Sequence, residues 1–298
     1  MATINTELFV NQRKKLGMSQ VALCRGICTQ STLSKFENKA QVPSVAILTQ
    51  LCDRLGLSLN QVYPEKAQLA QEQQLLIQLV QELTRDDLRA AVSLVNRGRT
   101  LTWQSADHQA TFLGLEVLTM ATTNQSWTAT LTVATRILEV VDQQRSTIAT
   151  NLAFLALAMM ISRHHDQQGM SLYMELLRQR MVRYQQPEQL SDLSAIDYGE
   201  LLLLMLGYAA LASQAGDYSL SDQWLHRLSI AANQRNLSAC LPRLKLLAAK
   251  NMIRQDGGPQ WQVTNLLNDA VAFARLHNNQ TVIVQGSALL QQQVKKNH

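Results

Sequence analysis

Within residues 1–63, apolar positions recur three and four apart, the spacing of helices that bury one face. Gly17, Gly26 and Gly56 interrupt this pattern, and glycine commonly ends a helix or makes a turn. Ser19 and Thr29 stand where a side-chain oxygen caps the start of the next helix. The pattern therefore predicts five short helices, over residues 6–16, 20–25, 30–37, 43–55 and 58–63.

The third of these helices has two distinct faces. Leu33 and Phe36 are three residues apart and should point into a small core with Leu23 and Ile27. Asn38 follows the helix where a glycine often closes it, and Asn tolerates the left-handed conformation needed there. The outer face then carries four short or flexible polar residues, Gln30, Ser31, Ser34 and Lys35.

Such an outer face suits the major groove of DNA. A Gln amide can bond adenine at two points, Ser can serve several bases, and Lys reaches guanine or phosphate. Five short helices with this turn chemistry predict a helix-turn-helix domain that binds double-stranded DNA. The alternative is a packed helical hairpin whose polar face only meets solvent.

The segment "GICTQSTLSKFEN", residues 26–38, is more specific. Residues 6–63 resemble the phage-repressor type of helix-turn-helix, and this segment resembles the PlcR and Rgg regulators, the peptide-pheromone receptors of Gram-positive bacteria. The resemblance implies that Gln30, Ser31 and Lys35 face bases, and that Gln20 and Arg25 lie near phosphates. The DNA-binding candidates are thus Gln20, Arg25, Thr29, Gln30, Ser31, Ser34 and Lys35.

The same resemblance implies an internal ion pair. In repressor-type domains an Arg of the first helix pairs with the Glu that ends the recognition helix, and Arg13 and Glu37 occupy those places. The alternative is two separately solvated side chains.

After residue 63 the chain changes character. The stretch "PEKAQLAQEQQ", residues 64–74, is polar and indicates a connecting helix or hinge. From there to the end, apolar helical patterns are mostly 15–25 residues long, and the 12 Gly and 5 Pro are few for 298 residues. The sequence thus predicts an all-α protein with a DNA-binding domain over 1–66, a linker or hinge over 67–74, and a helical-repeat domain over 75–298.

One helix pair, over residues 198–236, is close to a tetratricopeptide repeat. "AGDY", residues 215–218, is the turn between its helices, and Ala209 and Ala212 allow close approach. Ser221, Leu225 and Leu228 take the packing positions of the second helix. The other pairs are degenerate, so an irregular helical bundle stays as the alternative to a solenoid.

Charge favours the first segment as the phosphate-binding part. Residues 1–65 carry seven basic and four acidic residues, a net +3, whereas the remainder carries 20 basic and 18 acidic residues, a net +2. No apolar run approaches the roughly 20 residues that span a membrane. The four cysteines follow no disulfide framework, and no signal peptide is expected, so a cytoplasmic protein fits best.

Catalytic and metal-binding motifs are not found. The sequence has no P-loop, nucleophile elbow, dinucleotide fingerprint or zinc-protease motif. Cys24 and Cys28 lack further nearby ligands for zinc, and the adjacent His164 and His165 would point about 100° apart on a helix. We therefore expect neither an enzyme nor a bound cofactor or metal.

A helical solenoid presents a concave surface that can hold an extended peptide. The resemblance to PlcR and Rgg implies that a short signalling peptide binds there and changes how a homodimer binds DNA. Asn151, whose amide could both donate to and accept from a peptide backbone, and Arg163, which could take a carboxylate, are the candidate contacts. The runner-up is a DNA-binding regulator whose repeats bind a protein partner, and a third possibility is an interaction adaptor that no longer binds DNA.

Overall fold

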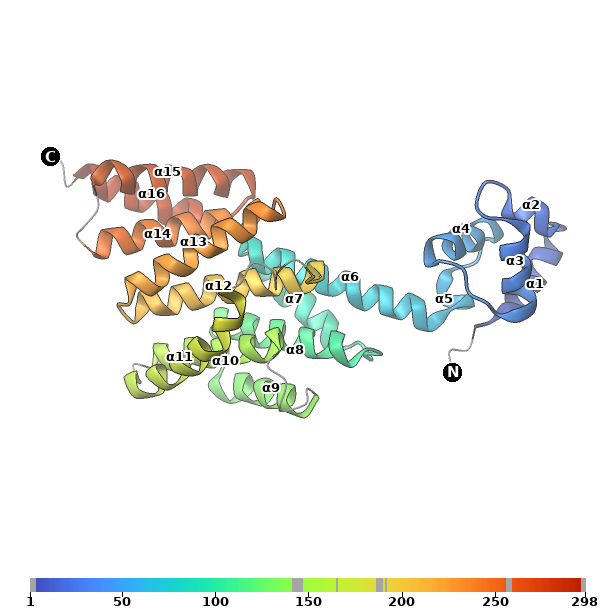
Figure 1. Ribbon diagram of the computed structural model, residues 1–298, viewed down its shortest axis with the longest axis horizontal. Coiled ribbons are helices and arrows are strands. Elements are labelled where there is room, and N and C mark those ends of the chain that lie inside the picture. The colour runs from blue at the N-terminus through green and yellow to red at the C-terminus, as the bar shows by residue number, and fades with distance from the viewer. Residues whose placement is uncertain are drawn as a thin grey trace. The chain divides into compact units, whose positions relative to one another are not determined.

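The computed structural model describes residues 4–140, 147–164, 166–185, 190, 192–255 and 259–295 (Figure 1). Over these residues the regular structure is entirely helical, which confirms the all-α prediction. The chain divides into two compact units. The first comprises residues 1–74 with 103–105, and the second comprises 75–102 with 106–298.

The first unit contains the five predicted helices. Ser19 and Thr29 cap the second and third helices by accepting hydrogen bonds from backbone N–H groups at 3.1 and 3.2 Å. Phe9 and Phe36 meet edge to face at 5.0 Å in a core that also contains Leu33. The helices are α1 (Thr6–Lys15), α2 (Gln20–Cys24), α3 (Gln30–Lys39), α4 (Val45–Leu55) and α5 (Leu59–Val62).

The end of α3 differs from the prediction. The helix continues to Lys39, and Ala40, not Asn38, takes the left-handed conformation, with φ 51°. Asn38 remains helical because its side-chain amide donates to Ser34 Oγ at 3.1 Å, one turn back.

Residues 67–74, expected as a linker or hinge, lie inside one continuous helix, α6 (Pro64–Arg85). The polar stretch is helical because Ala, Gln and Glu are all strong helix formers. Its Glu72 is fully buried and accepts the backbone N–H of Gln104 at 2.6 Å, which brings residues 103–105 into the first unit.

In the second unit, successive helices pack against one another as in a solenoid (Figure 1). Its larger helices are α7 (Leu88–Arg99), α8 (Ala106–Thr122), α9 (Trp127–Val140), α10 (Ile148–Arg163), α11 (Gln167–Met181), α12 (Ala195–Gln214), α13 (Tyr218–Gln234), α14 (Leu241–Arg254), α15 (Gln260–Leu276) and α16 (Gln280–Lys295). The 3₁₀ helices η1 (Val182–Gln185) and η3 (Ser238–Cys240) also lie between helices of this unit.

The α12–α13 pair has the predicted repeat geometry. Gly216 makes the turn with φ 84°, and Asp217 caps α13 by accepting the backbone N–H of Leu220 at 2.9 Å. Ser221 and Leu228 are fully buried, as their packing positions require. Among the described residues, α12 is also the one helix long and apolar enough to cross a membrane, but 78% of its apolar window is buried inside the protein, as in a core helix.

Helix α8 crosses α10 at very short range. A Cβ atom on Gly114 would lie 2.9 Å from the Cα atom of Ala149. Glycine facing alanine therefore lets the two helix backbones approach closely here.

Candidate nucleic-acid interface and repeat pocket

Helix α3 presents the polar face that the sequence predicts. Gln30, Ser31 and Lys35 are exposed, whereas Leu33 and Phe36 on the opposite side are fully buried. The core thus holds the underside of α3 and leaves its short polar side chains outward.

The predicted ion pair is confirmed. Arg13 donates from Nε and Nη2 to the two carboxylate oxygens of Glu37 at 2.6 and 2.8 Å, and its Nη1 donates to the carbonyl of Met18 at 2.8 Å. The side chains are only 11% and 3% exposed. The hydrogen bond to Glu37 raises the pKa of Arg13, so this guanidinium stays charged. The pair fixes α1 against the end of α3.

Gln20, which is expected near a phosphate, also makes two hydrogen bonds within the first unit. Its Nε2 donates to Glu37 Oε2 at 2.8 Å, while its Oε1 accepts from Gln30 Nε2 at 2.7 Å. A chain of contacts therefore runs from Arg13 through Glu37 and Gln20 to Gln30. The sequence analysis missed the Gln20–Gln30 contact, because it depends on how closely two helices approach across the turn.

The remaining candidates have mixed roles. Arg25 is exposed, and its carbonyl accepts from Arg54 Nη1 at 2.7 Å. Arg54, from α4, also donates to the carbonyl of Leu23 at 2.8 Å and so closes the end of α2, a function the sequence analysis did not find. Thr29 is occupied as the cap of α3, and Ser34 is half-buried beneath Asn38.

In the second unit, the candidate peptide contact Asn151 lies inside the packed helices. Its side chain is fully buried, and Nδ2 donates to the hydroxyl of Tyr184 at 3.3 Å. In this structure Asn151 thus makes a buried contact between α10 and η1, and its contact with a peptide backbone stays an untested prediction. Helix α10 is buried on most of its circumference, so helical periodicity alone could not separate an open face from a covered one.

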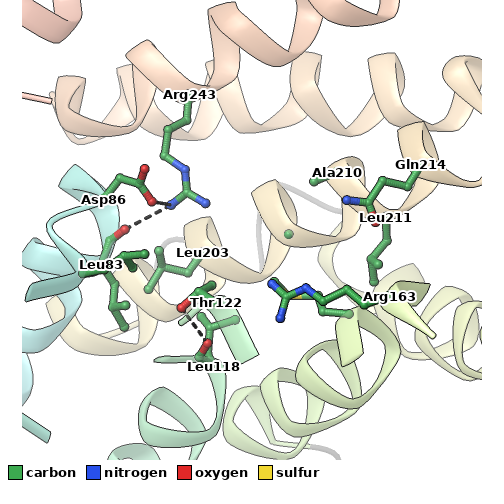
Figure 2. A pocket seen from close by; sticks show the side chains of 13 residues that line it. Leu83, Asp86, Leu118, Thr122, Arg163, Leu203, Ala210, Leu211, Gln214 and Arg243 are labelled. Carbon is green, nitrogen blue, oxygen red and sulfur yellow. Dashed lines mark hydrogen bonds and ion pairs between the residues drawn. The ribbon is translucent and has the colours of Figure 1, made fainter. Parts of the chain in front are cut away.

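Arg163, the second peptide candidate, lines a pocket of about 90 Å³ (Figure 2). Its Nη1 donates to the carbonyl of Ala121 and to Asn124 Oδ1, the latter at 3.2 Å. Arg243 from α14 lines the same pocket, which the sequence analysis did not foresee. The other lining groups are largely apolar and come mainly from α6, α7, α8, α10 and α12, including Leu83, Leu88, Leu118, Met159, Leu203 and Leu211.

No group of three His, Cys, Asp or Glu residues that could hold a metal ion occurs in the described part of the chain. Of the two adjacent histidines, His164 ends α10, and His165 lies outside the described residues.

Residues 11–62 match the helix-turn-helix family. The whole chain is similar to the crystal structure of Bacillus thuringiensis PlcR in complex with the peptide PapR7 and DNA, with a TM-score of 0.58 and 14% identity over 97% of this chain and 98% of that one. It is similar as well to ComR from S. thermophilus in complex with DNA and its signalling peptide ComS, with a TM-score of 0.56 and 16% identity over 96% and 98% of the two chains. No curated protein sequence matches the chain. The chain therefore joins a helix-turn-helix domain to a helical-repeat unit and shares the fold of the PlcR-type regulators.

Proposed function

We propose that this protein is a transcription regulator that binds double-stranded DNA in a sequence-specific manner and responds to a short signalling peptide. The observation that carries the proposal is the likeness in fold, along almost the full length of both chains, to PlcR and ComR in their complexes with DNA and peptide. The proposal assigns no catalysis to the chain.

The first unit supports the DNA-binding part. Gln30, Ser31 and Lys35 are exposed on a helix whose other face is fixed by the core and by the Arg13–Glu37 pair. A single recognition helix reads only a few base pairs, so repressor-type domains usually act as dimers on two half-sites about one DNA turn apart. We therefore include a cytoplasmic homodimer in the proposal.

The second unit supports the peptide-binding part. The pocket combines apolar walls with the guanidinium groups of Arg163 and Arg243, which suits an apolar side chain next to a carboxylate. At about 90 Å³ the pocket has room for one such group, so the rest of a peptide would lie along the helices outside it. Asn151 then acts indirectly, by holding Tyr184 in the wall of the unit.

Selection of bound sequences from a random DNA duplex library tests the first part. The full-length protein should enrich a pair of related half-sites, and its affinity for them should fall steeply as salt concentration rises, because phosphate contacts release counterions. Uniform recovery of the library, with no enriched sequence, would refute the DNA-binding proposal and favour the adaptor.

Mass spectrometry of molecules that co-purify from the native cell tests the second part. A short peptide bound to the full-length protein, and lost when Arg163 is replaced by Gln, is the expected result. If a second protein is recovered in stoichiometric amount and no peptide is found, the repeats bind a protein partner instead of a peptide. The DNA-binding part of the proposal would then still stand, provided that the selection enriches a DNA sequence.

A further inference from the structure

Arg243 joins two parts of the second unit that are distant in sequence. It lies near the start of α14, and its Nη1 donates to the carbonyl of Leu83, 160 residues earlier, at 3.1 Å. The same Nη1 is 3.7 Å from Asp86 Oδ1 (Figure 2). Arg243 therefore holds the last turn of α6 through one good hydrogen bond and one long ion pair.

Asp86 occupies an unusual backbone position. Its φ of 64° places it in the left-handed region, which Asp and Asn tolerate better than most residues. Its backbone N–H donates to the Leu83 carbonyl at 3.2 Å, so that oxygen receives bonds from both Asp86 and Arg243. The side chains of Asp86 and Arg243 are 15% and 27% exposed, which leaves the ion pair within reach of a ligand.

The pocket beside this pair carries an excess of positive charge. Arg163 enters it from α10, and the groups that accept its hydrogen bonds, the Ala121 carbonyl and the Asn124 amide, are neutral. Two guanidinium groups thus line one pocket with a single carboxylate, Asp86. A second carboxylate would balance the charge.

We infer that this pocket receives the C-terminal carboxylate and last apolar side chain of the peptide, and that this carboxylate replaces Asp86 as the partner of Arg243. The inference rests on the proposed peptide-binding function and deepens it. Asp86 acts in the ligand-free protein as an internal substitute for the peptide carboxylate. Because Arg243 also holds the Leu83 carbonyl, the exchange changes the end of α6, and that helix begins at Pro64 in the helix-turn-helix unit.

The test uses a synthetic library of random hexapeptides, made once with free C-terminal carboxylates and once as C-terminal amides. Each library is passed over the immobilised full-length protein, and retained peptides are identified by mass spectrometry. Peptides from the free-acid library should be retained, with an apolar last residue enriched, and their amides should not. Equal retention of both forms would leave peptide binding intact and overturn the carboxylate pocket, whereas retention of neither would refute the proposed function and this inference together.

Two variants with opposite expected effects then test the exchange, using the best-retained sequence as acid and as amide. Asp86→Asn removes the competing carboxylate but keeps a residue that tolerates positive φ, so the acid should bind about fivefold more tightly. Arg243→Gln should weaken binding of the acid about tenfold or more. The amide should bind only weakly to the original protein, and neither change should alter that weak affinity.

Lys245→Gln is the matched control, because it removes a positive charge from α14 where Lys245 pairs with Asp269. It should leave the affinity for the acid unchanged. General unfolding cannot produce tighter binding, so a gain with Asp86→Asn separates the exchange from damage to the fold. An unchanged or weaker affinity of the acid for the Asp86→Asn protein would overturn the inference.

Discussion

At the scale of single residues, the side chain of Gln30 is already oriented in the DNA-free protein, because its amide nitrogen donates a hydrogen bond to Gln20 Oε1. Its amide oxygen is left to accept from a base. Replacing Gln30 by Ala should cost about 1–3 kcal/mol on the selected site and relax the preference at one base pair. Gln20→Ala should weaken the preference at that same base pair, since Gln30 then loses its support.

Titrations against duplexes altered at each position measure this effect. Gln73→Ala, which changes an exposed Gln on α6, is the control and should change neither affinity nor base preference. If Gln30→Ala retains full affinity and base preference, α3 does not read bases through this residue.

Glu200 provides a second test at this scale. Its carboxyl is buried on α12, and Oε1 has no hydrogen-bond partner among the described residues. Burial raises the pKa of Glu200 well above its ordinary value, and Asp197 raises it further. The folded state therefore favours the protonated form of Glu200. The free energy of unfolding is highest below the pKa of about 4.3 that this carboxyl has in the unfolded chain, and it falls as pH rises towards the pKa in the folded protein.

Glu200→Gln keeps the shape and removes the ionisation. The variant should be more stable than the original protein at pH 7, and the difference should vanish near pH 4, changing by about 1.4 kcal/mol for each pH unit between the two pKa values. Urea unfolding at pH 4, 5.5 and 7 measures it. Glu175→Gln is the contrasting control, because hydrogen bonds from the charged Arg178 and the neutral Gln179 lower the pKa of that exposed carboxyl to about 2. Removing the Glu175 carboxylate should therefore not increase stability at pH 7.

At the scale of helices, the crossing of α8 and α10 depends on the absence of one methyl group. Gly114→Ala would place Cβ 2.9 Å from the Cα atom of Ala149, and a backbone atom cannot rotate away as a side chain can. We expect a loss of about 1–3 kcal/mol in the free energy of unfolding, despite the better helix propensity of Ala.

Gly286→Ala is the comparison within α16, where the new Cβ would lie 2.8 Å from a methyl group of the Val271 side chain and at an ordinary 3.9 Å from the Leu267 carbonyl oxygen. Denaturant titrations of both variants should show a clearly smaller loss for Gly286→Ala. Equal losses would mean that the α8–α10 backbones can separate without cost.

At the scale of the whole molecule, the proposed function requires the two ligands to influence one another. A coupling free energy of about 1–3 kcal/mol corresponds to a change of about 5–150-fold in affinity, and the effect must be reciprocal. The peptide should therefore bind with a different affinity when the selected DNA duplex is present. Titration of the peptide with and without duplex measures the factor, and identical affinities would exclude allosteric control while leaving both binding activities in place.

Much of the first unit followed from short-range patterns in the sequence. Ser19 and Thr29 cap helices, and Gly17, Gly26 and Gly56 take positive φ, because capping and turn formation depend on residues only three or four apart. The end of α3 was the exception, since Ala40 takes the left-handed backbone conformation, which is unfavourable for alanine. The Arg13–Glu37 pair followed from resemblance rather than from the pattern itself.

The candidate site in the second unit depended on the tertiary structure. Helical periodicity indicates that a face is buried but not which neighbour covers it, and Asn151 proved to be enclosed against Tyr184. Likewise, Arg243 meets Asp86 and Leu83 only because the solenoid brings α14 to the end of α6. The sequence by itself therefore determined the helices, their caps and the exposed face of α3, all of which depend on neighbours along the chain. The pocket, and the presence of both Arg163 and Arg243 in it, were decided by packing between distant helices, which no local pattern encodes.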